Sequence, residues 1–116
     1  MLGHLDLIAR YDPAGIYPFE KEKDIITEIL KQVIADGKGI EVNTSSVRYG
    51  LADSQPSRDI LRLYKVLGGT IITIGSDSHK KEHLGAYVEE TKALLKSLGY
   101  ERFCTFEKAS PVYHEL

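Results

Sequence analysis

Asp77 and His79 stand two positions apart in TIITIGSDSHKK (residues 70–81), directly after a run of β-branched and aliphatic residues. If the chain is extended there, alternate side chains point to the same side, so this carboxylate and imidazole can share one ion. Such nitrogen and oxygen donors suit Zn, Mn or Fe, and His4 from another strand would supply a third ligand. Three protein ligands leave coordination positions open, as in catalytic metal sites. The alternative is that Asp77 caps the following segment and His79 is a surface histidine.

The apolar pattern predicts alternating strands and helices that would position these residues. Strands are predicted at residues 3–9, 39–43 and 70–75, and helices over about 25–34, 56–67 and 84–98. A proline-containing loop at 10–23 precedes the first helix, and residues 101–116 alternate like a terminal hairpin or two short strands. This order predicts an α/β fold with parallel strands joined by right-handed crossovers. Because the carboxyl ends of parallel strands meet at one edge, the polar residues that follow them should converge. Those residues are His4, Asp6, Arg10, Asn43, Thr44, Arg48, Asp77 and His79.

The composition indicates a single domain, residues 1–116, and argues against several classes of protein. The 15 basic and 17 acidic residues give a net charge of -2 without a basic stripe, so no nucleic-acid partner is expected. No apolar run is long enough to span a bilayer and the N-terminus lacks a signal-peptide pattern, so no membrane partner is expected either. The single cysteine, Cys104, excludes an internal disulfide and favours a reducing compartment, the cytoplasm.

Three segments of the chain carry a family resemblance. GHLDLIARY, GIEVNTSSVRYG and GGTIITIGSDSHKKEHLG, in this order, resemble the late motifs of the polymerase and histidinol phosphatase (PHP) superfamily, most closely its histidinol-phosphatase branch. The resemblance implies a distorted β/α barrel with two or three divalent metals at its mouth. It also implies hydrolysis of a phosphate monoester, L-histidinol phosphate in histidine biosynthesis. In that case His4, Asp77 and His79 are metal ligands, while Arg10 and Arg48 bind the substrate phosphate, for which the planar guanidinium is well suited.

Other polar residues receive supporting or structural roles. Asp6 and Asn43 are expected to hydrogen-bond the metal ligands, although capping or loop contacts explain them as well. Glu41 is not expected to be a ligand and can instead satisfy a buried polar contact. His83 and His114 lie outside the matched motifs and are expected on the surface or in packing roles. Cys104 is expected to be a small core residue.

The chain also departs from the family, because no H-x-H motif is present and a complete β/α barrel needs about 250 residues. It resembles the C-terminal half only, a partial barrel of about three parallel β/α units and a short C-terminal β segment. Such a half leaves an open sheet edge and an apolar barrel-facing surface to be covered. Two functions stay open. The first is the C-terminal part of a phosphatase that needs its missing N-terminal half-barrel. The second is a non-catalytic half-barrel that keeps a partial metal site and binds a partner or another copy of itself.

Overall fold

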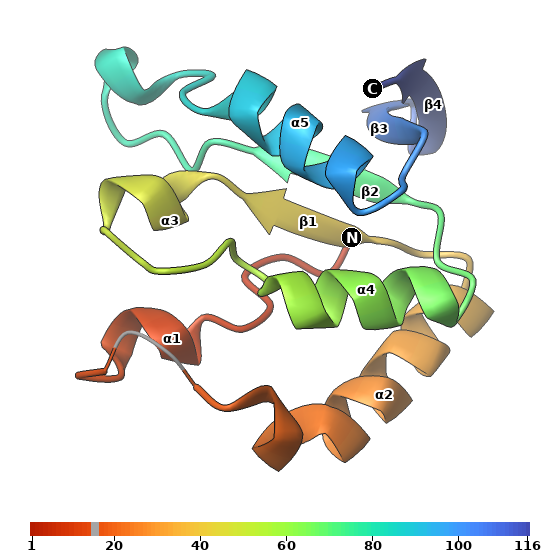
Figure 1. Ribbon diagram of the computed structural model, residues 1–116. Helices are drawn as coiled ribbons and strands as arrows, with labels where there is room; N and C mark the ends of the chain where they lie inside the picture. Colours follow the sequence, from red (N-terminus) through yellow and green to blue (C-terminus); the bar gives the residue numbers. More distant parts are fainter. Residues whose placement is uncertain (15–16) are drawn as a thin grey trace.

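The computed structural model describes residues 1–14 and 17–116; residues 15 and 16, part of the loop predicted before the first helix, lie outside this description. Figure 1 shows strands β1 and β2 side by side, with helix α5 next to β2 and helices α4 and α2 beyond β1. In chain order the elements are α1 (Ile8–Tyr11), α2 (Phe19–Ala35), β1 (Ile40–Asn43), α3 (Ser45–Arg48), α4 (Arg58–Val66), β2 (Ile72–Gly75), the 3-10 turn η1 (Lys81–His83), α5 (Val88–Ser97), β3 (Arg102–Glu107) and β4 (Ser110–Glu115).

The parallel sheet has two strands where three were predicted. β1 and β2 pair in parallel from Ile40 opposite Ile72 to Asn43 opposite Gly75, which confirms the α/β class. The strand predicted at residues 3–9 is wrong, because only Leu2 forms a bridge, to Ile40. Residues 4–7 turn instead and lead into α1. Positive φ angles at two of them, positions 4 and 6, end the extended conformation that a strand requires.

The three longer helices were predicted, but α2 begins at Phe19, inside the predicted loop, and α5 begins at Val88, after the predicted start at residue 84. The side chain of Ser57 caps α4 by accepting a hydrogen bond from the backbone N–H of Ile60 (3.4 Å). Helices α2, α4 and α5 each contribute side chains to a single core with β1 and β2. Each fully buried aliphatic side chain stabilises the fold by about 1.5–3 kcal/mol. The completely buried members are Leu30, Ile40, Ile60, Leu61, Tyr64, Ile72 and Leu95.

The C-terminal residues form the predicted hairpin. β3 and β4 are antiparallel, with Arg102 opposite Glu115 and Glu107 opposite Ser110. Lys108 and Ala109 at the turn have φ angles of 47° and 64°, the geometry of a tight type I′ connection. Residue 104, the single cysteine, is buried in β3, as expected for a small core residue.

The face of the sheet opposite the helices differs from the predicted apolar surface. Side chains alternate along β1, so Ile40 and Val42 enter the core while Glu41 points to the other face. Its partner on β2 is Thr73, and both are half-buried. The face of the sheet that would line the interior of a barrel is therefore polar at these positions.

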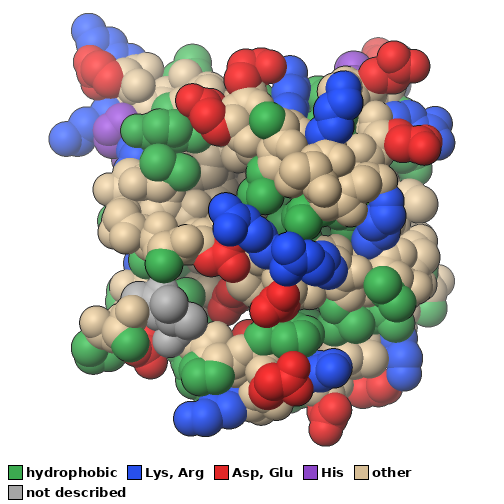
Figure 2. All heavy atoms as spheres, viewed as in Figure 1, with side chains coloured by type: hydrophobic (Ala, Val, Ile, Leu, Met, Phe, Trp, Pro, Cys, Tyr) green, Lys and Arg blue, Asp and Glu red, His purple; other side chains and the backbone are tan. Residues whose placement is uncertain are grey.

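On the outside of the molecule, Figure 2 shows basic and acidic side chains interspersed over one face. In the described ranges, no helix has the length and apolar character needed to cross a membrane.

Candidate metal and phosphate site

The predicted site residues come from three segments at one end of the parallel strands. Figure 1 shows α1, α3 and the segment after β2 at this end, where the carboxyl ends of β1 and β2 lie. The parallel pairing places Asn43 beside Gly75, so the loops that follow both strands start side by side. The turn at residues 4–7 joins them because Leu2 pairs with the start of β1. Residues distant in the sequence are thus brought together, as the parallel order predicts.

Asp77 is the centre of this cluster. Its Oδ1 lies 3.3 Å from His79 Nε2, and its Oδ2 lies 4.0 Å from His4 Nε2 and 3.6 Å from Arg10 Nη2. The Asp77 side chain is only 17% exposed, whereas His4 and His79 are 53% and 75% exposed. One largely buried carboxylate therefore presents its two oxygens to two accessible imidazoles from opposite ends of the chain.

The backbone at Asp77 is not extended, so the extended conformation predicted for Asp77 and His79 is wrong. β2 ends at Gly75, and Asp77 has a φ of 47°, in the left-handed region. Asp and His adopt this region more readily than most residues, but a non-glycine residue there needs support from its surroundings. His4 is also left-handed, with a φ of 53°. Two members of the cluster, Asp77 and His4, thus share an uncommon backbone conformation, which is typical of functional sites.

The charges around Asp77 keep it ionised. Burial alone would raise the pKa of its carboxyl group, but the net shift is downward. The largest lowering influence is the amide of Asn43, followed by the positive charge available on His79, on His4 and on Arg10. Asn43 Nδ2 itself has no hydrogen-bond partner among the described residues, so the amide faces the carboxylate at longer range. An anionic Asp77 is the form that a metal ion needs as a ligand.

Arg10 is held firmly beside this carboxylate. Its Nη2 donates to Ser45 Oγ (2.6 Å) and to Gln55 Oε1 (3.3 Å) and lies 3.6 Å from Asp77 Oδ2. The guanidinium also stacks over the ring of Tyr49, 4.1 Å from its centroid. These contacts fix the plane of the group and leave Nη1 outside them. Arg10 thus has the position and the pre-organised geometry to bind a phosphate group beside Asp77.

Arg48 takes a different part in the site. Its Nη1 donates to the carbonyl oxygen of Ser76 (2.8 Å) and its Nη2 to that of Asp77 (2.9 Å). These two bonds hold consecutive peptide groups, including the one that follows the left-handed Asp77. Two of the five guanidinium hydrogens are used in this way. In this arrangement Arg48 fixes the loop that carries the central carboxylate.

The two predicted supporting residues have distinct partners. Asn43 Oδ1 accepts from the backbone N–H of Ser45 (2.9 Å), which leaves the amide nitrogen on the side of Asp77. Asp6 turns to the start of α4, where its Oδ2 accepts from the backbone N–H of Ser57 (3.1 Å). Burial raises the pKa of Asp6, and the hydrogen bonds from Ser57 oppose that rise. Asn43 therefore supports the cluster, while the observed contact of Asp6 links its turn to α4 and does not involve a histidine.

Glu41 occupies the polar face of the sheet just below the cluster. A Cβ atom at Gly3 would lie 3.2 Å from Glu41 Oε2, and one at Gly75 would collide with Glu41 Oε1. Both glycines thus make room for this carboxylate.

Away from the cluster, His114 Nε2 lies 2.7 Å from Thr105 Oγ1 within the hairpin, which agrees with a packing role for His114.

The donor set fits a divalent metal, although the three candidate ligands form two pairs that share Asp77. Within residues 1–14 and 17–116, no three His, Cys, Asp or Glu side chains are assembled closely enough to hold an ion. The chemistry of the donors is nonetheless suitable, since one carboxylate and two imidazoles match the preferences of Zn, Mn or Fe. Both imidazoles are exposed side chains, free to adjust by rotation about their own bonds.

The sequence did not identify the residues that hold Arg10. Ser45 and Gln55 are buried, with exposed fractions of 0% and 1%, and Tyr49 lies exposed beside them. The polar run NTSS and the glutamine before Pro56 were visible signals, but short polar segments are common in loops. Their role depends on the approach of α1, which no local pattern predicts.

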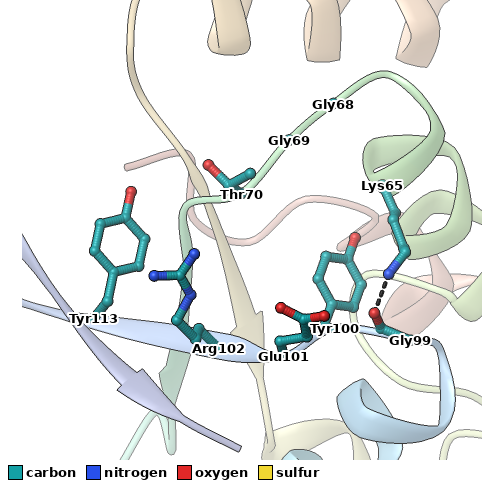
Figure 3. A pocket seen from close by; sticks show the side chains of 9 residues that line it. All are labelled: Lys65, Gly68, Gly69, Thr70, Gly99, Tyr100, Glu101, Arg102 and Tyr113. Atoms are coloured by element: carbon teal, nitrogen blue, oxygen red, sulfur yellow. Dashed lines mark hydrogen bonds between the residues drawn. The ribbon is translucent and has the colours of Figure 1, made fainter.

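A separate cavity of about 320 Å³ lies at the other end of β2 (Figure 3). Thr70 lines it, two residues before β2 begins, whereas Asp77 lies two residues after β2 ends. Seven residues of extended chain separate two points by about 20 Å. The two basic side chains of this cavity already have neighbours: Lys65 Nζ bonds the carbonyl oxygen of Gly99, and Arg102 lies 5.2 Å from the ring centroid of Tyr113. This cavity is therefore distinct from the Asp77 cluster.

Comparisons with known proteins relate this geometry to one group of enzymes. No family model matches the chain. A probable histidinol-phosphatase of Thermotoga maritima is 36% identical over 100 residues, which cover 86% of this chain and 41% of that protein. The histidinol-phosphatase of Lactococcus lactis is 33% identical over 106 residues, or 90% of this chain and 39% of that protein.

A solved structure agrees with these relatives. The crystal structure of histidinol phosphate phosphatase from Lactococcus lactis, complexed with zinc, L-histidinol and phosphate, superposes with a TM-score of 0.75 at 27% identity. The match covers 96% of this chain and 43% of that one. The chain thus spans about two fifths of the length of the proteins it matches. The resemblance found in the sequence is confirmed: over nearly its whole length, this chain is similar to part of the histidinol-phosphatases.

Proposed function

We propose that the chain is the C-terminal portion of a metal-dependent histidinol-phosphatase, which hydrolyses L-histidinol phosphate to L-histidinol and inorganic phosphate. The observation that carries this proposal is the convergence of His4, Arg10 and His79 on the two oxygens of Asp77. The identity with histidinol-phosphatases, and the zinc and phosphate named for the Lactococcus lactis structure, support the same reading.

Each residue of the cluster has a defined part in the proposed reaction. His4, Asp77 and His79 would hold divalent metal. When bound, such an ion lowers the pKa of water and polarises a phosphoryl oxygen. Arg10 would bind two phosphate oxygens through its free donors and offset the charge that develops on the transferring group. The oxygen of water joins phosphorus as the ester P–O bond breaks, and a proton passes to the leaving alcohol. Arg48 would keep the Asp77 loop in place throughout.

The fold implied by this function is a half of a PHP-type β/α barrel. The two parallel strands with helices on one face support this proposal, and so does the polar face that carries Glu41. In a closed barrel that face would line the interior, where polar side chains near the mouth serve ligand binding. We therefore infer that the partner of this chain is the remaining three fifths of a histidinol-phosphatase.

A hybrid protein tests the function. The part of the Thermotoga maritima relative that this chain does not match would be fused to residues 1–116, and phosphate release from L-histidinol phosphate measured with added zinc or manganese. We expect turnover by the hybrid, little or none by the isolated chain, and a loss of at least about 100-fold in the His79→Ala hybrid. His83→Ala is the matched control and should retain activity. A folded, metal-loaded hybrid without turnover would contradict the proposal.

The second candidate, a non-catalytic half-barrel, is favoured by the half-buried polar face that carries Glu41 and by the two-stranded sheet with its open edges. It predicts that the isolated chain self-associates and retains metal, and that the hybrid stays inactive. Sedimentation of the chain over a range of concentrations, together with the hybrid assay, separates the two functions.

A further inference from the structure

Gln55 is a buried polar side chain to which neither the sequence motifs nor the proposed reaction assigns a role. It is 1% exposed and lies at the tip of β1, where its carbonyl oxygen accepts from the backbone N–H of Asn43 (2.7 Å). Its side-chain Oε1 accepts from Arg10 Nη2 (3.3 Å). A buried polar side chain costs free energy unless it is paired, so its single observed side-chain contact indicates what it serves.

That contact completes the anchoring of the Arg10 guanidinium. Nη2 carries two hydrogens, and its two acceptors are Ser45 Oγ and Gln55 Oε1. The ring of Tyr49 covers one face of the group at 4.1 Å. Two acceptors on one nitrogen and an aromatic ring on one face fix both the position and the plane of the guanidinium. Without Gln55, rotation about the remaining bond to Ser45 becomes possible.

The orientation of the Gln55 amide also indicates the charge of the ligand. Because Arg10 has only donors, the atom facing it must be the oxygen, and the amide nitrogen points the other way. Gln55 Nε2 and Arg10 Nε are both buried and lack an acceptor within the described ranges. The unused Nε–H of the fixed Arg10 guanidinium suits an oxyanion.

We propose that Gln55 is a positioning residue which, together with Ser45, holds the Arg10 guanidinium ready for the phosphate group of the substrate. This inference rests on the proposed function, because that function gives Arg10 a phosphate to bind. Gln55 acts through Arg10, and its effect is therefore on phosphate affinity.

The order of the Arg10 side chain is the direct test. Nitrogen-15 relaxation of the Arg10 Nε–H group in the 116-residue chain reports how firmly the guanidinium is held, with no ligand present. Gln55→Met keeps the length of the side chain and removes the acceptor, so Arg10 should become more mobile. Gln55→Glu keeps an acceptor oxygen and should hold Arg10 at least as firmly as the wild type. Gln32→Met, at the other glutamine of the chain, should change nothing.

Titration with inorganic phosphate supplies the second readout. We expect Gln55→Met to weaken phosphate binding about fivefold to tenfold, the loss expected for one hydrogen bond, and Gln55→Glu to leave Arg10 ordered. An Arg10 signal as ordered in Gln55→Met as in the wild type overturns the proposal, and so does a mobile Arg10 in folded Gln55→Glu. If the wild-type chain binds no phosphate, the proposed function loses its support at Arg10, while the relaxation comparison still decides whether Gln55 positions it.

Discussion

Arg48→Met should weaken metal binding although it replaces none of the candidate ligands. Arg48 donates to the carbonyl oxygens of Ser76 and Asp77 at 2.8 and 2.9 Å, and these bonds support the left-handed backbone of Asp77. A hydrogen bond from a charged donor contributes about 1.5 kcal/mol at the low end of its range, so two contribute about 3 kcal/mol. Arg48 is half-buried, and solvent screening reduces this sum to about 1.5 kcal/mol. Because 1.4 kcal/mol is a factor of ten, zinc affinity should fall about tenfold.

Calorimetric titration of the 116-residue chain with zinc measures this effect. Arg62→Met is the matched control, because Arg62 is 58% exposed on α4 and, among the described residues, pairs only with Asp59 in the same helix. The two roles considered for Arg48, support of the Asp77 loop and binding of the substrate phosphate, predict opposite results. If Arg48 fixes the loop, zinc affinity falls even without phosphate. A folded Arg48→Met variant whose zinc affinity stays within about twofold of the wild type would refute the reasoning, because this result is expected when Arg48 contacts only the substrate.

Two further substitutions test the packing that supports the site. Gly39→Ala should lower the free energy of unfolding by at least about 2 kcal/mol in urea titration, because a Cβ there would collide with the backbone carbonyl of Ile71. Gly3→Ala should cost less, since its new Cβ would meet only the flexible carboxylate of Glu41; equal losses would contradict this ranking. Cys104 is 2% exposed and burial raises the pKa of its thiol, so a thiol reagent at pH 8 should modify it only in the unfolded chain. Rapid modification of the native protein would show that β3 is less well packed than described.

The elements that local patterns specify were predictable from the sequence. The apolar spacing over residues 25–34 and 56–67 predicted α2 and α4, because those side chains face one core. The run TIITIG predicted β2, and the alternation after Gly99 predicted the hairpin. The segment GHLDLIA was mistaken for a strand, since its apolar content resembles one. The left-handed backbone conformations of His4 and Asp6 depend on tertiary contacts, which the local pattern of apolar residues does not reveal.

The sequence predicted which residues meet in the site better than it predicted the contacts that each of them makes. Parallel strand order was enough to expect the segments after β1 and β2 side by side, whereas His4 and Arg10 reach Asp77 from a turn and a short helix that were not predicted. The contacts of Arg48 with two carbonyl oxygens were not predictable, because an arginine that binds phosphate and one that binds carbonyl oxygens have the same sequence signature. The anchors of Arg10 were missed for a related reason. Hydrogen bonds between residues 35 or 45 positions apart leave no periodic signal.

The central claim is that chain-distant donors gather on Asp77 to hold one metal centre. The most direct measurement is elemental analysis of the purified 116-residue chain after zinc loading and gel filtration, beside its His4→Ala, His79→Ala and His114→Ala variants. The account predicts that the first two lose zinc and that the third, with its histidine in the hairpin, keeps it. Wild-type zinc content in the His4→Ala variant, with loss only in His79→Ala, would show that residue 4 does not share the ion and would contradict the claim.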